Sequence, residues 1–220
     1  MNSFQLVIAT RNRIAKLERT LSSVPELDYQ TIVLVCDGDE KTFEHFKNYR
    51  RDITIRLVPI HMGSVFCRNV IIKDSIDGVL YATDDITFSE SSIQKAFELF
   101  NNTFPDDDGV VGFKQNRSSK DCPTGVALVG KEFIKRYPKR NMFYPKYYHF
   151  CAQEVSRLCE KLEKNVFVTS NDLLITHYHP AYIKEEMDQT HRDARVHRAE
   201  DRALSSARRK SGEIWGDSNI

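Results

Sequence analysis

The sequence has no long apolar run and no sign of an export signal. No stretch approaches the roughly 18 apolar residues that a helix needs to span a bilayer. The N-terminus, MNSFQLVIATRNR, has only a short apolar run and no small-residue cleavage site, so we expect no signal peptide. These absences lead us to expect a soluble, cytoplasmic protein that meets a membrane only from its surface.

Paired cysteines and an excess of one charge are also missing. The five cysteines form no C-x-x-C motif and are odd in number, so we expect free thiols in a reducing compartment. They are Cys36, Cys67, Cys122, Cys151 and Cys159. The 32 basic residues nearly balance the 31 acidic ones, and the net charge of +1 gives no case for a polyanion-binding surface across the whole molecule.

The chain shows no internal repeat and no flexible linker. Its 220 residues are enough for one large domain with a sizeable core. We expect that domain over residues 1–180. From residue 181 the sequence is highly charged and poor in apolar residues, which predicts a helical or partly disordered extension over 181–220.

The N-terminal half alternates two apolar patterns. Buried strands are predicted at residues 4–10, 30–39, 53–60 and 78–85. Helix-spaced apolar residues lie between them, at 14–24, 41–51 and 64–76. We expect Ser64 to cap the third helix. This alternation predicts an α/β fold with a mainly parallel sheet covered by helices on both faces.

The second half is less regular. Helices are predicted at 91–104 and 154–165, short strands with a further helix between 110 and 138, and a return to β structure over 166–180. We therefore expect the sheet to be completed by short elements after the regular alternation ends.

Polar residues stand where three of the predicted strands end. They are the pairs Thr10-Arg11, Asp37-Gly38 and Asp84-Asp85. Ligands of open α/β sheets bind outside the carboxyl ends of the strands, so these pairs should converge on one crevice. Two adjacent carboxylates repel each other, and burying one is costly unless a cation or donors are nearby. The Asp84-Asp85 pair therefore indicates a site for a positive group.

Seven motifs in this order resemble a known family. LVIATRNR, VLVCDGDE, GSVFCRN, LYATDDITF, TGVALVGKEFI, QEVSRLCEKLEK and LLITHYHP are similar to the succession of motifs in family-2-type glycosyltransferases with the GT-A fold, over about residues 4–180. The resemblance implies a nucleotide-diphosphate sugar as donor, UDP by family habit, with Mn²⁺ or Mg²⁺ and inversion at the transferred carbon. The acceptor stays open between a glycan, a lipid-linked sugar and a modified nucleic acid.

The resemblance also implies roles for single residues. Asp85 and His177 would bind the metal, with His179 as the second choice for the histidine, and Asp84 would assist or contact the ribose. The family commonly has a third acid where this chain has Thr83. The nucleotide-binding residues would be Thr10, Arg11, Arg13, Asp37, Gly38 and Arg68.

The same resemblance places a catalytic base at the start of the helix that contains EVSRLCEKLEK. Glu154 is the acid that this segment offers for taking a proton from the acceptor hydroxyl. A helix-stabilising acid at the first turn is the competing interpretation of Glu154.

Two other functions compete with this one. Nucleotidyltransferases share the architecture, but they usually carry a glycine-rich loop after the first strand, and ATRNRIAK has no glycine. The Arg- and His-rich segment 191–210 could bind nucleic acid, although a solvated mixed-charge helix is the more frequent explanation of such a segment.

Overall fold

A computed structural model describes residues 1–74, 77–116, 123–149, 152–180, 183 and 186–217. The strands are β1 Phe4–Thr10, β2 Gln30–Asp37, β3 Ile53–Val58, β4 Gly78–Thr83, β5 Ile86–Phe88, β6 Val110–Gly112, β7 Lys114–Gln115, β8 Ala127–Val129, β9 Asn165–Phe167 and β10 Leu174–His177. The α-helices are α1 Ile14–Ser22, α2 Glu40–Phe46, α3 Ser64–Ile72, α4 Ser92–Thr103, α5 Lys131–Ile134, α6 Ala152–Lys161 and α7 Gln189–Lys210. Short 3₁₀ turns cover Pro138–Arg140 and Asn171–Leu173.

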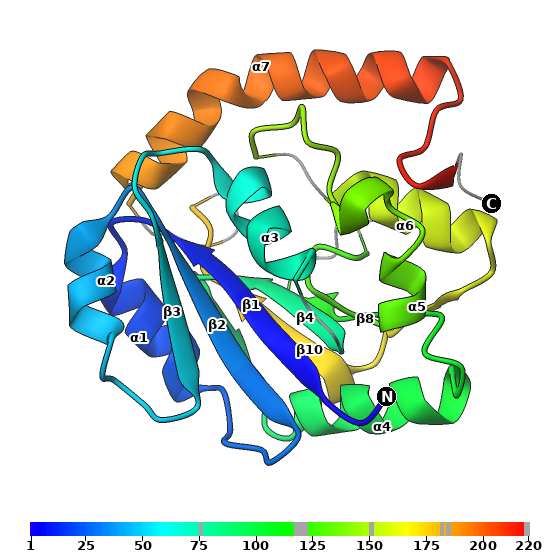
Figure 1. The fold of residues 1–220 in the computed structure, drawn as a ribbon, viewed down its shortest axis with the longest axis horizontal. Helices are drawn as coiled ribbons and strands as arrows, with labels where there is room; N and C mark the ends of the chain where they lie inside the picture. The colour runs from blue at the N-terminus through cyan, green and yellow to red at the C-terminus, as the bar shows by residue number, and fades with distance from the viewer. Residues whose placement is uncertain (75–76, 117–122, 150–151, 181–182, 184–185, 218–220) are drawn as a thin grey trace.

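The central sheet has the strand order β3-β2-β1-β4-β8-β6-β9 (Figure 1). The first four strands in this order are parallel, so the carboxyl ends of β1, β2 and β4 meet at one edge. β8 runs antiparallel to both β4 and β6, while β9 is parallel to β6. The expected mainly parallel α/β sheet is confirmed. A second, small sheet has the order β5-β10-β7 and places the end of β10 beside Asp85.

Side chains of β1 alternate between two separate cores. Leu6 and Ile8 pack in one core with residues of α1 and α4, whereas Val7 packs in the other with residues of α3, α5 and α6. Since successive side chains of a strand point to opposite faces, both faces of the sheet are buried. This explains why these strands read as continuous apolar runs.

The start of α3 differs from the prediction. Ser64 is the first residue of the helix, and Gly63 is the N-cap with φ of 89°. A side chain at Gly63 would be strained at this positive φ and would meet the backbone oxygen of Tyr148 at 2.8 Å. Glycine is therefore the residue that lets the chain enter α3 under the Tyr148 loop.

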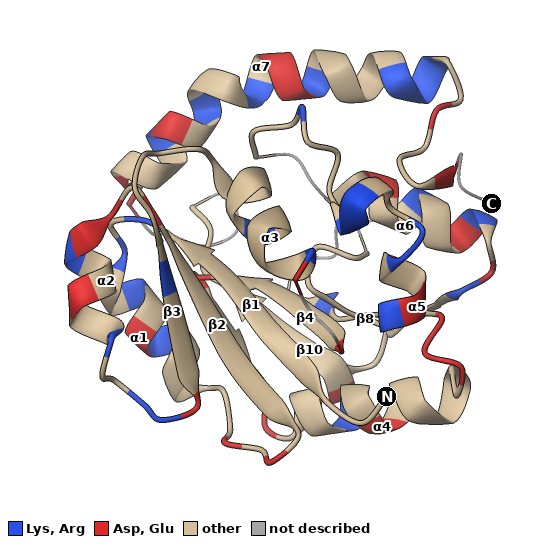
Figure 2. Ribbon diagram, viewed as in Figure 1, with Lys and Arg blue, Asp and Glu red and all other residues tan. Residues whose placement is uncertain are grey.

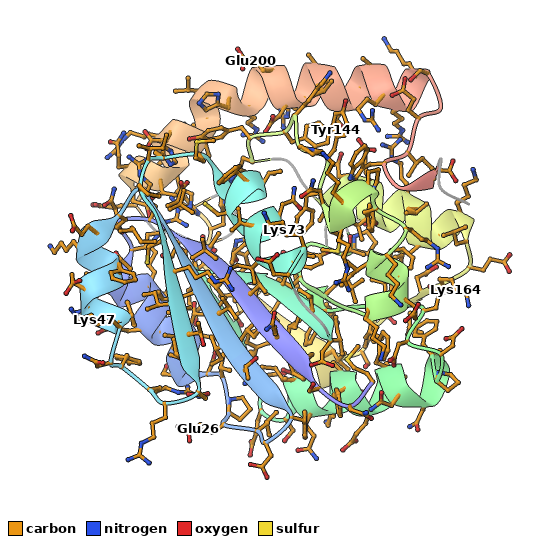
Figure 3. All side chains as sticks on the ribbon, in the orientation of Figure 1. Glu26, Lys47, Lys73, Tyr144, Lys164 and Glu200 are labelled. Carbon is orange, nitrogen blue, oxygen red and sulfur yellow. The ribbon has the colours of Figure 1, made fainter. Side chains whose placement is uncertain are left out.

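The highly charged segment after residue 181 contains α7, a long helix that runs along one edge of the molecule (Figure 1). Its charged residues of both signs are spread along its length (Figure 2), and its three buried residues are the polar His191, Asp201 and Arg208. Glu200 projects away from the molecule on the outer side of α7 (Figure 3). The helix is thus attached through polar side chains rather than through an apolar stripe.

Three contacts fix α7 along its length. Near its start, the Thr190 hydroxyl donates to the backbone oxygen of Arg11 at 2.7 Å. In its middle, the Asp201 carboxylate accepts hydrogen bonds from the backbone N–H groups of residues 148 and 149. Near its end, Arg208 pairs with Glu154 at 2.7 Å. No helix in the described ranges is long and apolar enough to cross a bilayer.

Candidate active site

A cavity of about 450 Å³ lies at the carboxyl ends of β1, β2 and β4 and is bounded by α3 and α7. Eight of the residues predicted from the sequence line it, namely Thr10, Arg11, Arg13, Asp37, Arg68, Asp84, Asp85 and His177. The parallel register that aligns the ends of β1, β2 and β4 brings these residues together from distant parts of the chain. Gly38 and Glu154 are not among the lining residues.

Asp84 is buried and strongly hydrogen-bonded. The Thr10 hydroxyl donates to one carboxylate oxygen at 2.8 Å, and Nη1 of Arg13 donates to the other at 2.7 Å. Burial raises the pKa of Asp84, the charge of Arg13 opposes this shift, and the neighbouring Asp85 adds to it. The carboxylate is therefore held by the protein's own donors at the floor of the cavity.

Asp85, also buried, faces two imidazoles. Nε2 of His177 lies 3.2 Å from one carboxylate oxygen, and Nε2 of His191 lies 3.6 Å from the other. Burial alone would raise the pKa of Asp85, but the hydrogen bonds from His177 and His191 outweigh it and hold the pKa well below its ordinary value. The pKa values of the two neighbouring aspartates are therefore shifted in opposite directions, downward for Asp85 and upward for Asp84.

Arg13 resolves the repulsion between the two carboxylates. Its guanidinium contacts Asp84, lies 3.6 Å from Asp85, and donates twice to Asp188 at 2.9 and 3.0 Å. Burial alone would lower the pKa of Arg13, but the charges of Asp84 and Asp85 reverse this and raise it. One buried guanidinium therefore serves three carboxylates, and Lys16 adds a second cation 3.0 Å from Asp188.

His191 was not among the site residues predicted from the sequence. Asp188 is the N-cap of α7 and accepts the backbone N–H of His191, whose Nδ1 lies 2.9 Å from the same carboxylate. Burial lowers the pKa of His191, but Asp188 and Asp85 more than compensate and raise it. The Asp-x-x-His pattern at a helix start was the available signal in the sequence. His179 lies between the two other histidines, with ring centroids 4.8 Å from His191 and 5.7 Å from His177.

Asp37 has a different environment from the one expected. Its carboxylate accepts from the backbone N–H groups of Met62 and Gly63 at 2.7 and 3.0 Å, and Nδ1 of His61 lies 2.6 Å away. The other ring nitrogen of His61 contacts the Tyr148 hydroxyl. Asp37 therefore fixes the loop before α3 and presents His61 at the cavity wall.

Gly38 has a backbone role. Its φ is +64°, and an added Cβ would meet the backbone nitrogen of His61 at 2.7 Å. The absence of a side chain lets the loop before α3 pass closely over the end of β2.

Glu154 is placed away from the cavity, under the far end of α7. Its carboxylate accepts from Arg208 at 2.7 and 3.0 Å, from the Tyr147 hydroxyl at 2.6 Å and from the backbone N–H of Trp215 at 2.6 Å. Burial raises the pKa of Glu154, but these hydrogen bonds outweigh it and lower the pKa. These contacts make Glu154 an anchor for α7, and it does not line the cavity where eight of the other predicted site residues meet.

Of the two histidines beside Asp85, His177 is suited to binding a metal. Nδ1 of His177 lies 3.1 Å from the amide oxygen of Gln115 and can donate to it, so with a metal bound Nε2 would present its lone pair to the metal instead of a hydrogen to Asp85. The separation of 3.2 Å between Nε2 and the Asp85 oxygen fits two neighbouring ligands, because octahedral ligands about 2.1 Å from a metal lie about 3 Å apart. The described residues contain no group of three or more ligating side chains arranged around one point. Asp85 and His177 would therefore fit a metal that takes its other ligands from a bound phosphate and water.

The family of the chain follows from its match to a family model. The glycosyl transferase family 64 domain matches residues 4–176. The chain belongs to this family. The expected GT-A glycosyltransferase resemblance is confirmed, with family 64 in place of the family-2 type. The matched segment ends before α7, so His191 and the cavity-lining part of α7 lie outside the family 64 match.

Solved structures share the fold of this family 64 domain at low sequence identity. GalNAc-T7, described with UDP, GalNAc and Mn²⁺, is 14% identical with a TM-score of 0.64, over 80% of this chain and 44% of that one. Residues 1–349 of S. aureus TarS are 14% identical with a TM-score of 0.50, over 62% of this chain and 50% of that one. This chain thus spans half or less of either structure. No curated protein sequence matches it.

Proposed function

We propose that this family 64 domain transfers a sugar from a nucleotide-diphosphate sugar, with UDP as the nucleotide, to an acceptor hydroxyl, and that Mn²⁺ or Mg²⁺ assists the transfer. The observation that carries the proposal is the buried Asp84-Asp85 pair on the floor of a cavity at the carboxyl edge of a parallel sheet. The UDP and Mn²⁺ described with the GalNAc-T7 structure, which shares this fold, support the choice of ligand.

The residues divide the work by position. Asp85 and His177 would hold the metal, which when bound neutralises charge on the leaving diphosphate. Asp84 and Arg13 form a fixed ion pair that keeps the first loop against the cavity floor. Arg11 and Arg68 line the cavity and can donate hydrogen bonds to the nucleotide, whereas the Thr10 hydroxyl, which donates to Asp84, can accept one. Asp37 contributes by fixing the loop before α3, and that loop places His61 at the cavity wall, where it can contact the nucleotide.

Inversion of configuration would require a base beside the acceptor hydroxyl. Glu154 lies outside the cavity and is occupied by Arg208, Tyr147 and the Trp215 backbone, which does not support its expected role as that base. Inversion therefore stays a prediction from family resemblance. The anomeric proton coupling of the product, measured by NMR, decides between inversion and retention.

The first test is calorimetric binding of UDP, GDP and dTDP, each with and without Mn²⁺. We expect wild type to bind UDP more tightly with Mn²⁺, and Asp85→Asn to lose that metal effect while keeping the shape of the side chain. Asp172→Asn, an exposed carboxylate remote from the cavity, is the matched control and should bind as wild type does. If wild type binds none of the three nucleotides with Mn²⁺ present, the proposal is wrong.

A further inference from the structure

Two arginines of α7 line the cavity and have no ionic partner among the described residues. Arg11 pairs with Asp193, and Arg13 pairs with Asp84 and Asp188, so these two cations are already engaged. Arg195 and Arg198 also line the cavity, yet no carboxylate of the described residues lies within ion-pairing distance of either. The cavity lining contains five arginines and five aspartates, and within it Arg195 and Arg198 are not tied to a carboxylate of the described residues.

The helix holds these two side chains in a defined place. They are three residues apart, so both project from one side of α7. Between them, the ring of His197 stacks on Tyr148 with centroids 3.7 Å apart, and Asp201, three residues after Arg198, binds the backbone of the same loop. Because both contacts lie within one turn of Arg198, the backbone that carries the two guanidinium groups is fixed over the cavity.

Arg68 supplies a third guanidinium from a different element. It projects from α3, lines the same cavity, and its Nη2 donates to the backbone oxygen of Ala82 at 3.2 Å. Cations from two helices therefore border one cavity. Like charges three residues apart on a helix repel each other, and a bound anion would relieve that repulsion.

We propose that Arg195 and Arg198 form a clamp on α7 that binds the diphosphate of the donor. The proposal rests on the proposed function and assigns a binding role to a helix outside the family 64 match. A guanidinium offers parallel N–H donors that fit two oxygens of one phosphate, so two neighbouring guanidinium groups match the two phosphates of a diphosphate. The clamp acts through protein cations, so it contributes to binding whether or not a metal is present.

The test compares ligands that differ in phosphate content. Inorganic pyrophosphate, UDP, UMP and uridine are titrated by calorimetry in EDTA and again with Mn²⁺. The variant is Arg195→Ala with Arg198→Ala. The matched control is Arg202→Ala with Arg209→Ala, which removes two exposed arginines of the same helix that do not line the cavity. Circular dichroism and the thermal midpoint check that both variants fold.

Hydrogen bonds to charged groups are strong enough that losing both arginines should weaken UDP and pyrophosphate binding by about tenfold or more. UMP should weaken less, and uridine should not change. The control pair should bind all ligands as wild type does. A clamp variant that binds UDP and pyrophosphate within about twofold of wild type overturns the clamp but leaves the proposed function standing.

Two further outcomes separate the clamp from the donor site. If wild type binds pyrophosphate but no nucleoside diphosphate, and the clamp variant loses pyrophosphate, the clamp takes a free anion or an anionic acceptor group and the proposed donor is wrong. If wild type binds neither pyrophosphate nor any nucleoside diphosphate, both proposals are wrong.

Discussion

Among single residues, Arg13 is the one on which the acidic pair depends most. Its guanidinium is buried and contacts Asp84, Asp85 and Asp188. Taking away one partner of a buried ion pair leaves an uncompensated charge in a poorly solvated place. The cavity floor is therefore stable only while this cation is present or another cation replaces it.

We predict that Arg13→Met lowers the free energy of unfolding by about 3–5 kcal/mol, the usual cost of breaking a buried pair. Denaturant unfolding followed by circular dichroism measures it. Lys47→Met is the matched control, because Lys47 pairs with Glu44 on the exposed surface and such pairs contribute about 1 kcal/mol or less. Equal effects of the two substitutions would show that Arg13 does not neutralise the pair. Addition of Mn²⁺ should recover part of the loss if Asp85 binds the metal.

At the scale of elements, the sequence allowed the alternation of strands and helices in the first half to be predicted. The apolar period differs between a strand and a helix, and burial on both faces of the sheet keeps β1, β2 and β4 continuously apolar. The polar pairs at the strand ends could be predicted to meet because parallel strands share one carboxyl edge.

The position of α7 could not be predicted in the same way. Its buried residues are polar, and its partners Arg11 and Glu154 lie far away in the sequence, so no local apolar stripe marks its docking face. For the same reason, the contact of Glu154 with Arg208 could not be predicted from the sequence. The sequence around a glutamate at the start of a helix is the same whether that glutamate serves as a base, as a helix-stabilising acid or as a partner for a distant arginine.

The anchor between α7 and α6 gives a prediction for Glu154. We expect Glu154→Gln to speed hydrogen exchange of the last turns of α7, because Arg208 loses a buried carboxylate partner. The rate of sugar transfer should fall only in proportion to the fraction of the variant that is unfolded. UDP affinity should stay near that of wild type, since Thr190 and Asp201 still hold the start and the middle of the helix.

Arg208→Gln is the matched variant, because it breaks the same pair from the other side. In the double variant the last turns of α7 should exchange hydrogen no faster than in either single variant, since each single substitution already breaks the Glu154–Arg208 pair. Transfer abolished by Glu154→Gln but kept by Arg208→Gln would contradict this assignment and restore Glu154 as the catalytic base.

Across the whole molecule, ion pairs at the start of β6 join distant parts of the chain. Asp107 contacts the N-terminal amine and lies 3.2 Å from Lys131, while Asp108 pairs with Arg136 and lies 3.4 Å from Lys164. Burial raises the pKa of both carboxyls, but their cationic partners outweigh it and lower the pKa. The first strand, α5 and the end of α6 are therefore tied together by groups that must stay ionised.

This arrangement predicts loss of stability in acid. A carboxyl whose pKa is lower in the folded state stabilises the fold above its unfolded pKa, about 3.9 for aspartate, and that contribution disappears as the pH falls through the folded pKa. We expect Asp108→Asn to lower the free energy of unfolding by about 1–3 kcal/mol at pH 6 and by progressively less toward pH 3, because its bonds to Arg136 are lost at every pH while wild type loses them only in acid. Thermal unfolding of both proteins between pH 3 and 7 measures the difference. Asp172→Asn removes an exposed carboxylate and should leave the pH profile as it is, since solvent screens its pair with Lys95. If the difference in stability between wild type and Asp108→Asn stays constant from pH 3 to 7, protonation of Asp108 does not contribute to the loss of stability in acid.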